Sequence, residues 1–187
     1  MVKRRNSGGQ KRLYTFAELQ EAIEWVNELA EAAQVKVALG GGLAMQLYGS
    51  DRLTSDVDII AERDVPGMEE IGRLSFGGQK ARGKGGVPTD IIVREDEVAP
   101  LYEDALQASH RVEGMVVRVV QPEFLAVMKL WAGREDKDIP DVKFLIREEL
   151  IDLPLTRKLM KKYLGIYAVK DFDSLVREVA WQASEEK

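Results

Sequence analysis

The sequence predicts a mixed α/β fold of the α+β class, with a small mixed sheet flanked by helices and a C-terminal helical extension. Three observations support this prediction. Strand-like and helix-like segments alternate up to about residue 120, the pattern beyond Pro122 is almost purely helical, and a composition of 45% hydrophobic and 32% charged residues is that of a globular protein. We expect a flexible basic tail over residues 1–12, an α/β core over 13–120 and a helical part over 121–187 packed on that core.

The first expected helix begins directly after the tail. Thr15 and Glu18 have the spacing of a capping box, and apolar residues then recur at helical spacing up to about Ala33. A strand is expected over 35–39, because valine and leucine alternate there with lysine and alanine. This strand runs into three consecutive glycines, and a short helix should then extend to Tyr48.

Two further strands are expected, over 56–61 and 89–93, since both segments are rich in valine and isoleucine. Between them, Pro66 and Gly67 should open a short helical or irregular stretch. The glycine-rich segment 75–88 predicts a mobile loop or a ragged hairpin.

The rest of the chain predicts one helix, one hairpin and a run of four helices. Residues 98–108 have helical spacing, whereas Glu113 and Gly114 in the middle of 111–120 favour a hairpin. Pro122 suits the first position of a helix. The four C-terminal helices are expected at about 122–133, 138–149, 155–163 and 172–184.

The composition excludes several kinds of chemistry. The chain has no cysteine and a single histidine, His110, so disulfides, thiolate catalysis, cysteine-bound zinc and most serine–histidine triads are unavailable within it. We interpret His110 as a surface or packing residue. Trp25, Trp131 and Trp181 fall on expected helices, where core packing is the default. Chemistry must therefore come from carboxylates, amines and the backbone.

Charge and hydropathy limit the partners and the location. A net charge of −5 argues against a protein that coats nucleic acid, although local basic clusters exist, one of them formed by Lys80, Arg82 and Lys84. Solvated surface charge is the simple alternative for each cluster. No apolar run approaches the roughly 20 residues that span a bilayer, and no apolar signal segment follows the basic N-terminus. We therefore expect a cytoplasmic protein with no membrane partner.

Asp56 and Asp58 are the first candidates for catalysis. They are two residues apart on an expected strand, so both side chains point to the same face. Two such charges repel each other unless a cation lies between them, and carboxylate oxygens suit Mg²⁺ or Mn²⁺. A pair of solvated carboxylates at a strand end is the alternative explanation.

The glycines Gly40, Gly41 and Gly42 lie between an expected strand and an expected helix. Such glycines let the backbone approach a phosphate closely and direct N–H groups at it, although they could also form a simple tight turn. A phosphate-binding turn followed by a pair of metal-binding carboxylates is what a metal-assisted reaction on a nucleoside triphosphate requires.

Asp90 is an acid within an otherwise apolar strand. If this strand neighbours the one that holds Asp56 and Asp58, its carboxylate completes a cluster of three acids. Two metal ions about 3.5–4 Å apart could then activate the attacking hydroxyl and hold the triphosphate, with Asp90 on the side of the nucleophile. An exposed acid at a strand end is the alternative.

These residues resemble a known signature, that of the polymerase-beta-type nucleotidyltransferase superfamily, and most closely its AbiEii/AbiGii toxin-like branch of type IV toxin–antitoxin systems. The first part of the resemblance is Gly41-Gly42-Leu43-Ala44, Tyr48-Gly49, Arg52, Thr54 and Asp56-Val57-Asp58-Ile59. The second part, similar to a helical motif of that branch, is Pro122 to Met128, Lys129, Arg134, Lys137-Asp138 and Asp141. Together the two parts cover roughly residues 35–147.

The resemblance implies a nucleotidyltransferase fold and a set of site residues. It assigns the triphosphate to Gly41 and Gly42, the metal to Asp56 and Asp58, and the role of third acid to Asp90. Lys129 is implied to face the nucleotide phosphates. The other residues implied on the nucleotide side are Arg52, Thr54, Lys137, Asp138 and Asp141. Many members carry serine where this chain has Gly42, so here the backbone alone is offered at that position.

The helical residues also have explanations that need no ligand. Lys129 is the only cation in an apolar helical stretch, a costly place for a charge without a partner, but a lysine stem can also carry its ammonium group to solvent. Asp138 and Asp141 lie at the start of an expected helix, where the helix dipole alone favours acids.

The activity implied is transfer of a nucleoside monophosphate from a nucleoside triphosphate, with Mg²⁺ or Mn²⁺, to an acceptor hydroxyl. The acceptor could be an RNA 3′ end, a protein side chain or a small molecule. The chain could also be the toxin of a toxin–antitoxin pair, with a cognate antitoxin as partner. The alternative is a catalytically weak nucleotide-binding or interaction protein on the same fold, and the presence of all three acids favours the enzyme.

Overall fold

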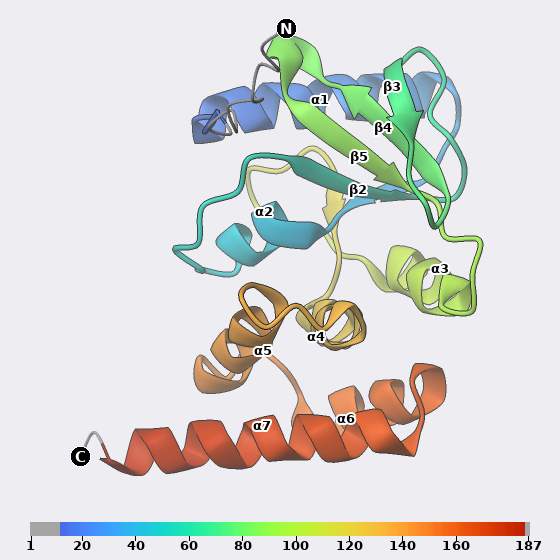
Figure 1. The fold of residues 1–187 in the computed structure, drawn as a ribbon. Helices are drawn as coiled ribbons and strands as arrows, with labels where there is room; N and C mark the ends of the chain where they lie inside the picture. The colour runs from blue at the N-terminus through green and yellow to red at the C-terminus, as the bar shows by residue number, and fades with distance from the viewer. Residues whose placement is uncertain (1–11, 186–187) are drawn as a thin grey trace, which may run out of the picture.

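The computed structural model describes residues 12–185, which form a mixed six-stranded sheet and a series of helices (Figure 1). The α+β class expected from the sequence is thereby confirmed, while the expected tail falls outside the described residues except for Arg12. The strands are β1 (Val37–Leu39), β2 (Val57–Ala61), β3 (Glu69–Arg73), β4 (Gly78–Arg82), β5 (Pro88–Ile92) and β6 (Arg118–Val119). The helices are α1 (Phe16–Ala32), α2 (Gly41–Leu47), the 3-10 helix η1 (Lys84–Gly86), α3 (Ala99–Ala108), α4 (Pro122–Ala132), α5 (Asp138–Arg147), α6 (Leu153–Tyr163) and α7 (Ile166–Glu185).

The strand order is β3-β4-β5-β2-β1-β6. β2 is parallel to β5 and β1 is parallel to β6, whereas the other neighbouring pairs are antiparallel. Helix α1 covers one face of the sheet, and α2 and α3 lie on the other side of it (Figure 1). Beyond these two helices follow α4 with α5 and then α6 with α7, so the C-terminal half is stacked on one side of the sheet (Figure 1).

Local sequence signals explain the first helix. Thr15 Oγ1 accepts a hydrogen bond from the Glu18 backbone N–H at 3.3 Å, and Glu18 Oε2 accepts one from the Thr15 N–H at 2.8 Å, which closes the expected capping box. The apolar residues of α1 then fall on one face, which is buried against the sheet and includes Leu19, Ile23 and Val26.

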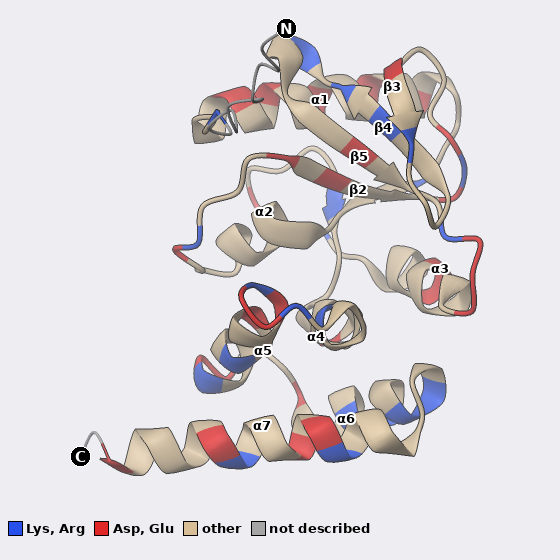
Figure 2. Ribbon diagram, viewed as in Figure 1, with Lys and Arg blue, Asp and Glu red and all other residues tan. Residues whose placement is uncertain are grey.

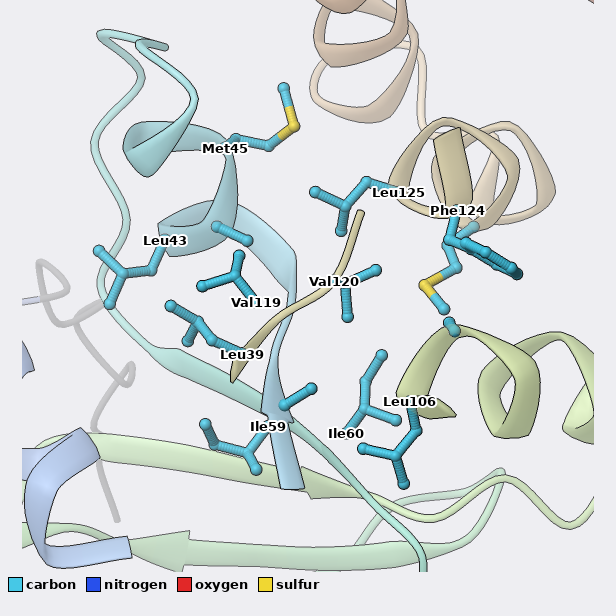
Figure 3. Close-up of a cluster of buried hydrophobic side chains, with 14 of the residues drawn as sticks. Leu39, Leu43, Met45, Ile59, Ile60, Leu106, Val119, Val120, Phe124 and Leu125 are labelled. Atoms are coloured by element: carbon cyan, nitrogen blue, oxygen red, sulfur yellow. The ribbon is translucent and has the colours of Figure 1, made fainter. Parts of the chain in front are cut away.

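One apolar core joins the sheet to the helical half. Leu39, Ile59 and Ile60 from the sheet meet side chains of α2, α3 and α4, and Figure 3 shows Leu106 and Leu125 entering the same cluster from the helices. Burial of each large aliphatic side chain contributes about 1.5–3 kcal/mol, so this shared cluster holds α4 firmly beneath the sheet.

For the segment 75–88 the mobile loop is wrong, whereas the hairpin expected as its alternative is closer, because β4 and β5 pair as consecutive antiparallel strands and are packed in the sheet. The segment contains β4, which pairs with both β3 and β5, and its Gln79 and Ala81 are buried. The glycines here serve close packing of strands: a β-carbon on Gly78, whose φ is +95°, would lie 2.0 Å from the Ile91 carbonyl oxygen. Glycine content was therefore the wrong guide to flexibility.

Three other expectations need correction. The stretch after Gly67 forms β3, an exposed edge strand whose charged composition gives no apolar pattern. Residues 111–120 do not form the expected hairpin. Their one strand, β6, pairs with β1, and the other pairing of this segment is a single antiparallel bridge between Val119 and His110. Helix α7 begins six residues earlier than expected, directly after Gly165, whose φ is +88°.

The expectation of core packing is wrong for two of the three tryptophans. Trp131 is 41% exposed and Trp181 is 63% exposed. Among residues 12–185, every helix is too short or too polar to cross a lipid bilayer.

Candidate active site

A row of charged side chains crosses three neighbouring strands at the centre of the sheet. Asp58 on β2 is opposite Asp90 on β5, and Asp90 is opposite Lys80 on β4. Figure 2 shows these charges on adjacent ribbons, acidic on β2 and β5 and basic on β4. The condition for a cluster of acids is thus met, because the strands of Asp58 and Asp90 are direct neighbours in parallel register.

Asp58 lies at the electrostatic centre of this row. It is partly buried, and burial together with the negative charges of Asp56 and Asp90 raises the pKa of Asp58 to about 6. The charge of Lys129 and a hydrogen bond from the Gly42 backbone N–H act in the opposite direction but do not cancel the rise. A cation placed beside Asp58 would therefore be favoured.

Gly41 packs directly against this carboxylate. Its φ is +59°, and a β-carbon at this position would lie 1.8 Å from Asp58 Oδ2. Both the backbone conformation and the contact require glycine. The N-terminus of α2 and the carboxylate are therefore held together without any side chain between them.

Gly42 has no room for a side chain either. A β-carbon there would lie 2.9 Å from Thr54 Oγ1 and 3.0 Å from Arg52 Nη2. The Thr54 hydroxyl in turn donates a hydrogen bond to Asp56 Oδ1 at 2.8 Å. A serine at this position would require the side chains of Thr54 and Arg52 to shift.

A buried ionic network joins the loop before β2 to α4 and α5. Lys129 Nζ lies 2.6 Å from Asp141 Oδ2 and 3.5 Å from Asp138 Oδ1, and all three side chains are at most 7% exposed. Arg52 donates to both Asp141 oxygens at 3.1 and 3.2 Å. Arg134 donates to both Asp138 oxygens at 2.6 and 3.0 Å. Lys129 is thus buried and paired, which rules out the alternative of a lysine that reaches solvent.

Asp138 is charged within this network. Burial alone would raise the pKa of Asp138, but hydrogen bonds from Arg134 and the charge of Lys129 outweigh burial and lower it. The helix dipole alone therefore does not explain why an acid occupies position 138, since the Asp138 side chain pairs with two cations, Lys129 and Arg134.

The charged row and the network face each other across a cleft of about 730 Å³ between the sheet and α4–α5. Of the residues expected in the site, Gly41, Asp58, Asp90, Lys129 and Asp138 line the cleft. Gly42, Arg52, Thr54, Asp56 and Asp141 support this lining through the contacts above. Lys137 is exposed, precedes α5 and does not line the cleft.

The cleft also contains residues that sequence patterns did not identify as site residues. Phe76, Arg94, Tyr102 and Trp131 also line it, and Arg94 contacts the rings of Phe76 and Tyr102. Arg94 lies two residues after the end of β5 and belongs to no sequence motif. The two aromatic residues that it contacts, Phe76 and Tyr102, are not its neighbours in the chain. No local signal in the sequence could have found this group.

The donor set suits a metal ion that shares its ligands with a substrate. Within residues 12–185, no three carboxylate or histidine side chains are arranged as a preformed metal-binding group. Mg²⁺ commonly takes one or two protein carboxylates and completes its coordination with water and substrate phosphates. Asp58 and its acidic neighbours fit that mode of binding.

One solved structure supports a nucleotidyltransferase-like fold for this chain. An antigenic nucleotidyltransferase-like protein from Paracoccidioides brasiliensis superposes with a TM-score of 0.52 and 19% identity, over 89% of this chain and 95% of that protein. The solution structure of the antibiotic-resistance factor ANT(2'')-Ia covers 88% of this chain and 94% of its own at 17% identity, with a TM-score of 0.45. A search among curated protein sequences found no match.

One family model matches nearly the whole chain. The family described as "Nucleotidyltransferase of unknown function (DUF6036)" matches residues 16–187, which include every site residue discussed above. This match confirms the predicted superfamily and the prediction of a nucleotidyltransferase, whereas the AbiEii/AbiGii branch stays a prediction. The chain therefore belongs to the DUF6036 family of nucleotidyltransferases, whose function is unknown.

Proposed function

We propose that this nucleotidyltransferase moves a nucleoside monophosphate from a nucleoside triphosphate, bound with Mg²⁺ or Mn²⁺, to an acceptor hydroxyl in the cleft between the sheet and α4–α5. The observation that carries the proposal is the direct opposition of Asp58 and Asp90 on neighbouring strands, with Gly41 packed against the Asp58 carboxylate. Carboxylates beside a close backbone turn suit a reaction on a polyphosphate.

The chemistry follows from the positions of the charges. The acceptor oxygen attacks the α-phosphorus, the bond from that phosphorus to the bridging oxygen breaks, and pyrophosphate leaves. Asp90 would accept the hydrogen bond of the attacking hydroxyl and receive its proton. Asp58, with Asp56 behind it, would hold the metal, which neutralises phosphate charge when it is bound.

The opposite wall would attract the triphosphate electrostatically. Lys129 and Arg134 both line the cleft, and although each is paired with an aspartate, Arg134 is 59% exposed and has guanidinium surface to offer. Positioning and charge neutralisation would supply most of the rate, as in phosphoryl transfer generally.

RNA is the acceptor that we favour over a protein or a small molecule. Lys80 lines the cleft and is opposite Asp90, and Arg82 lies two residues further on the same face of β4. Lys84 follows in η1 and is exposed. These three cations could guide a phosphate backbone whose terminal hydroxyl attacks the nucleotide. A toxin role with a cognate antitoxin is suggested by the sequence resemblance alone.

A catalytically weak nucleotide-binding protein is the second candidate. It is favoured by one observation, that no preformed group of three metal ligands exists among the described residues. This candidate predicts binding of nucleotide without transfer.

Incubation with each α-³²P-labelled nucleoside triphosphate and Mg²⁺ distinguishes the two candidates. Total RNA, protein extract and aminoglycosides are supplied separately as acceptors. Label in one acceptor that disappears in Asp90→Asn supports the transferase. Calorimetric binding of Mg²⁺–nucleotide with no label in any acceptor supports the second candidate, and absence of both binding and label rejects the site.

A further inference from the structure

The lining of the cleft changes from charged to apolar along β2 and β5. One step beyond the row of Asp58 and Asp90, the same faces of β2 and β5 carry Ile60 and Ile92, which are opposite each other and line the cleft. Gly78 of β4 is opposite Ile92. Beyond this apolar row, the turn between β3 and β4 meets the segment after β5, where the Glu95 N–H donates to the Phe76 carbonyl at 3.2 Å.

Arg94 organises this far end of the cleft. Its guanidinium carbon lies 4.3 Å from the ring centre of Phe76 and 5.1 Å from that of Tyr102. Asp96 accepts hydrogen bonds from Arg94 Nε at 3.0 Å and from Nη2 at 2.5 Å. The Arg94 side chain is 8% exposed, so its cation is paired and its faces are covered by rings.

Helix α4 contributes apolar side chains to the cleft. Leu125, Met128 and Trp131 line the cleft, and Trp131 is 41% exposed. The cleft therefore contains the rings of Phe76, Tyr102 and Trp131 beside aliphatic side chains, and the cation next to two of these rings is neutralised by Asp96.

We propose that this far end binds the planar base of the nucleotide, with Phe76 as a contact residue and Arg94 as the positioning residue that fixes the two rings. The inference rests on the proposed function, because it assumes that the triphosphate lies at the row of Asp58 and Asp90. Stacking on aromatic rings is the interaction that every base can make.

The spacing along the strand agrees with this arrangement. Arg94 is four residues beyond Asp90, which corresponds to about 13 Å of extended chain at roughly 3.3 Å per residue. A nucleotide whose phosphates lie at the charged row can span that length. Phosphate binding at the far end is disfavoured, because the charge of Arg94 is used by Asp96 and the adjoining walls are apolar.

The test compares two ligands that share the phosphates and differ in the base. Calorimetric titration of the full chain with Mg²⁺ measures the affinity for each of the four nucleoside triphosphates and for inorganic tripolyphosphate. We expect wild-type protein to bind at least one nucleoside triphosphate about tenfold more tightly than tripolyphosphate. Phe76→Leu and Arg94→Lys should remove about that factor and leave tripolyphosphate binding unchanged.

Matched variants make the result specific. Phe76→Trp keeps a ring and should retain nucleotide affinity. Phe16→Leu changes a phenylalanine that is 50% exposed on α1, on the other face of the sheet, and should alter neither ligand's binding. Arg94→Lys keeps the positive charge but loses the planar group between the rings, so it separates positioning from charge.

Three outcomes would overturn the inference. Equal wild-type affinity for nucleotides and tripolyphosphate would show that the base makes no contact, while the proposed function would stand. Unchanged nucleotide affinity in both Phe76→Leu and Arg94→Lys, or a parallel loss of tripolyphosphate binding, would remove the assignment of the far end. Failure of wild-type protein to bind either ligand would reject the proposed function and the inference with it.

Discussion

Gly41 and Asp58 lie so close together that a β-carbon on Gly41 would be 1.8 Å from Asp58 Oδ2. Gly41 begins α2 and Asp58 lies on β2, and both of these elements contribute to the core. The contact therefore ties the position of a candidate metal ligand to the fold itself.

Substitution of Gly41 by alanine tests this contact. We expect Gly41→Ala to lose measurable Mg²⁺–nucleotide binding and to destabilise the protein by about 1–3 kcal/mol, because it adds a clash to a left-handed backbone conformation. Calorimetry and urea unfolding measure the two effects. Gly114→Ala is the control, since Gly114 also has a positive φ, +79°, but no atom within 4 Å of a β-carbon. Equal loss of binding in both variants would contradict the role of the contact.

Asp58→Asn should stabilise the protein in the absence of metal while it weakens Mg²⁺–nucleotide binding. The pKa of Asp58 is raised to about 6 from an ordinary 3.8, mainly by burial and then by Asp56 and Asp90, so the folded state binds the proton more tightly than the unfolded state. Ionisation therefore lowers the stability of the wild type as pH rises from about 4 to 6, and the cost persists above pH 6. A shift of about two pKa units sets an upper limit of roughly 3 kcal/mol.

Urea unfolding in EDTA at pH 4 and pH 7.5 measures this difference. Asp58→Asn should gain stability at pH 7.5 and little at pH 4. Asp51→Asn, which removes an exposed acid from the preceding loop, controls for the change in net charge. A loss of stability in Asp58→Asn at pH 7.5 would show that the carboxylate is favourably bound without metal.

Lys129→Met should destabilise the protein by about 2–4 kcal/mol, because it leaves Asp138 and Asp141 buried with one cation fewer. Lys143→Met is the matched control: Lys143 pairs with Glu178 at 2.6 Å, but the two side chains are 28% and 42% exposed. That variant should cost at most about 1 kcal/mol. Chemical unfolding compares the two, and similar losses would mean that burial of the network contributes little.

Neutralisation of Lys80, Arg82 and Lys84 to glutamine should reduce label transfer to RNA and make the remaining transfer less sensitive to salt. The reason is that contacts with a phosphate backbone release counterions, so each lost contact lowers the salt dependence. Label transfer at two salt concentrations measures both effects.

An equal change of charge on another surface is the control for that experiment. Lys158, Lys161 and Arg177 are exposed on α6 and α7, beyond α4 and α5 from the sheet (Figure 2). The triple glutamine variant of these residues should transfer label to RNA at the wild-type rate. A similar loss in both triple variants would indicate that net charge, and not the cations of β4 and η1, attracts the RNA.

The sequence was sufficient wherever a signal is local. Thr15 with Glu18 predicted the start of α1, and the valine and isoleucine residues after Asp56 predicted β2, although this strand begins at Val57 and leaves Asp56 outside it. β3 and β4 were missed because their pairing depends on other strands, and most of their own residues are charged or glycine.

For the candidate site, too, the sequence identified individual residues but not the contacts between distant ones. The sequence identified Asp58 and Asp90 as candidate acids, but the burial of Lys129 between Asp138 and Asp141 depends on how α4 and α5 pack. Arg94 lies 18 residues after Phe76 and 8 before Tyr102, and only the folded chain brings their side chains together.

The two edges of the sheet have a consequence for association between chains. β3 ends one edge with three charged residues among five and an irregular register between Glu70 and Gly72, and β6 ends the other with two residues. Short, charged or irregular edge strands offer a poor ladder for strand addition and protect a sheet against edge-to-edge aggregation. Self-association or capture of a partner by this protein should therefore use helical surfaces or the cleft, and leave the sheet unextended.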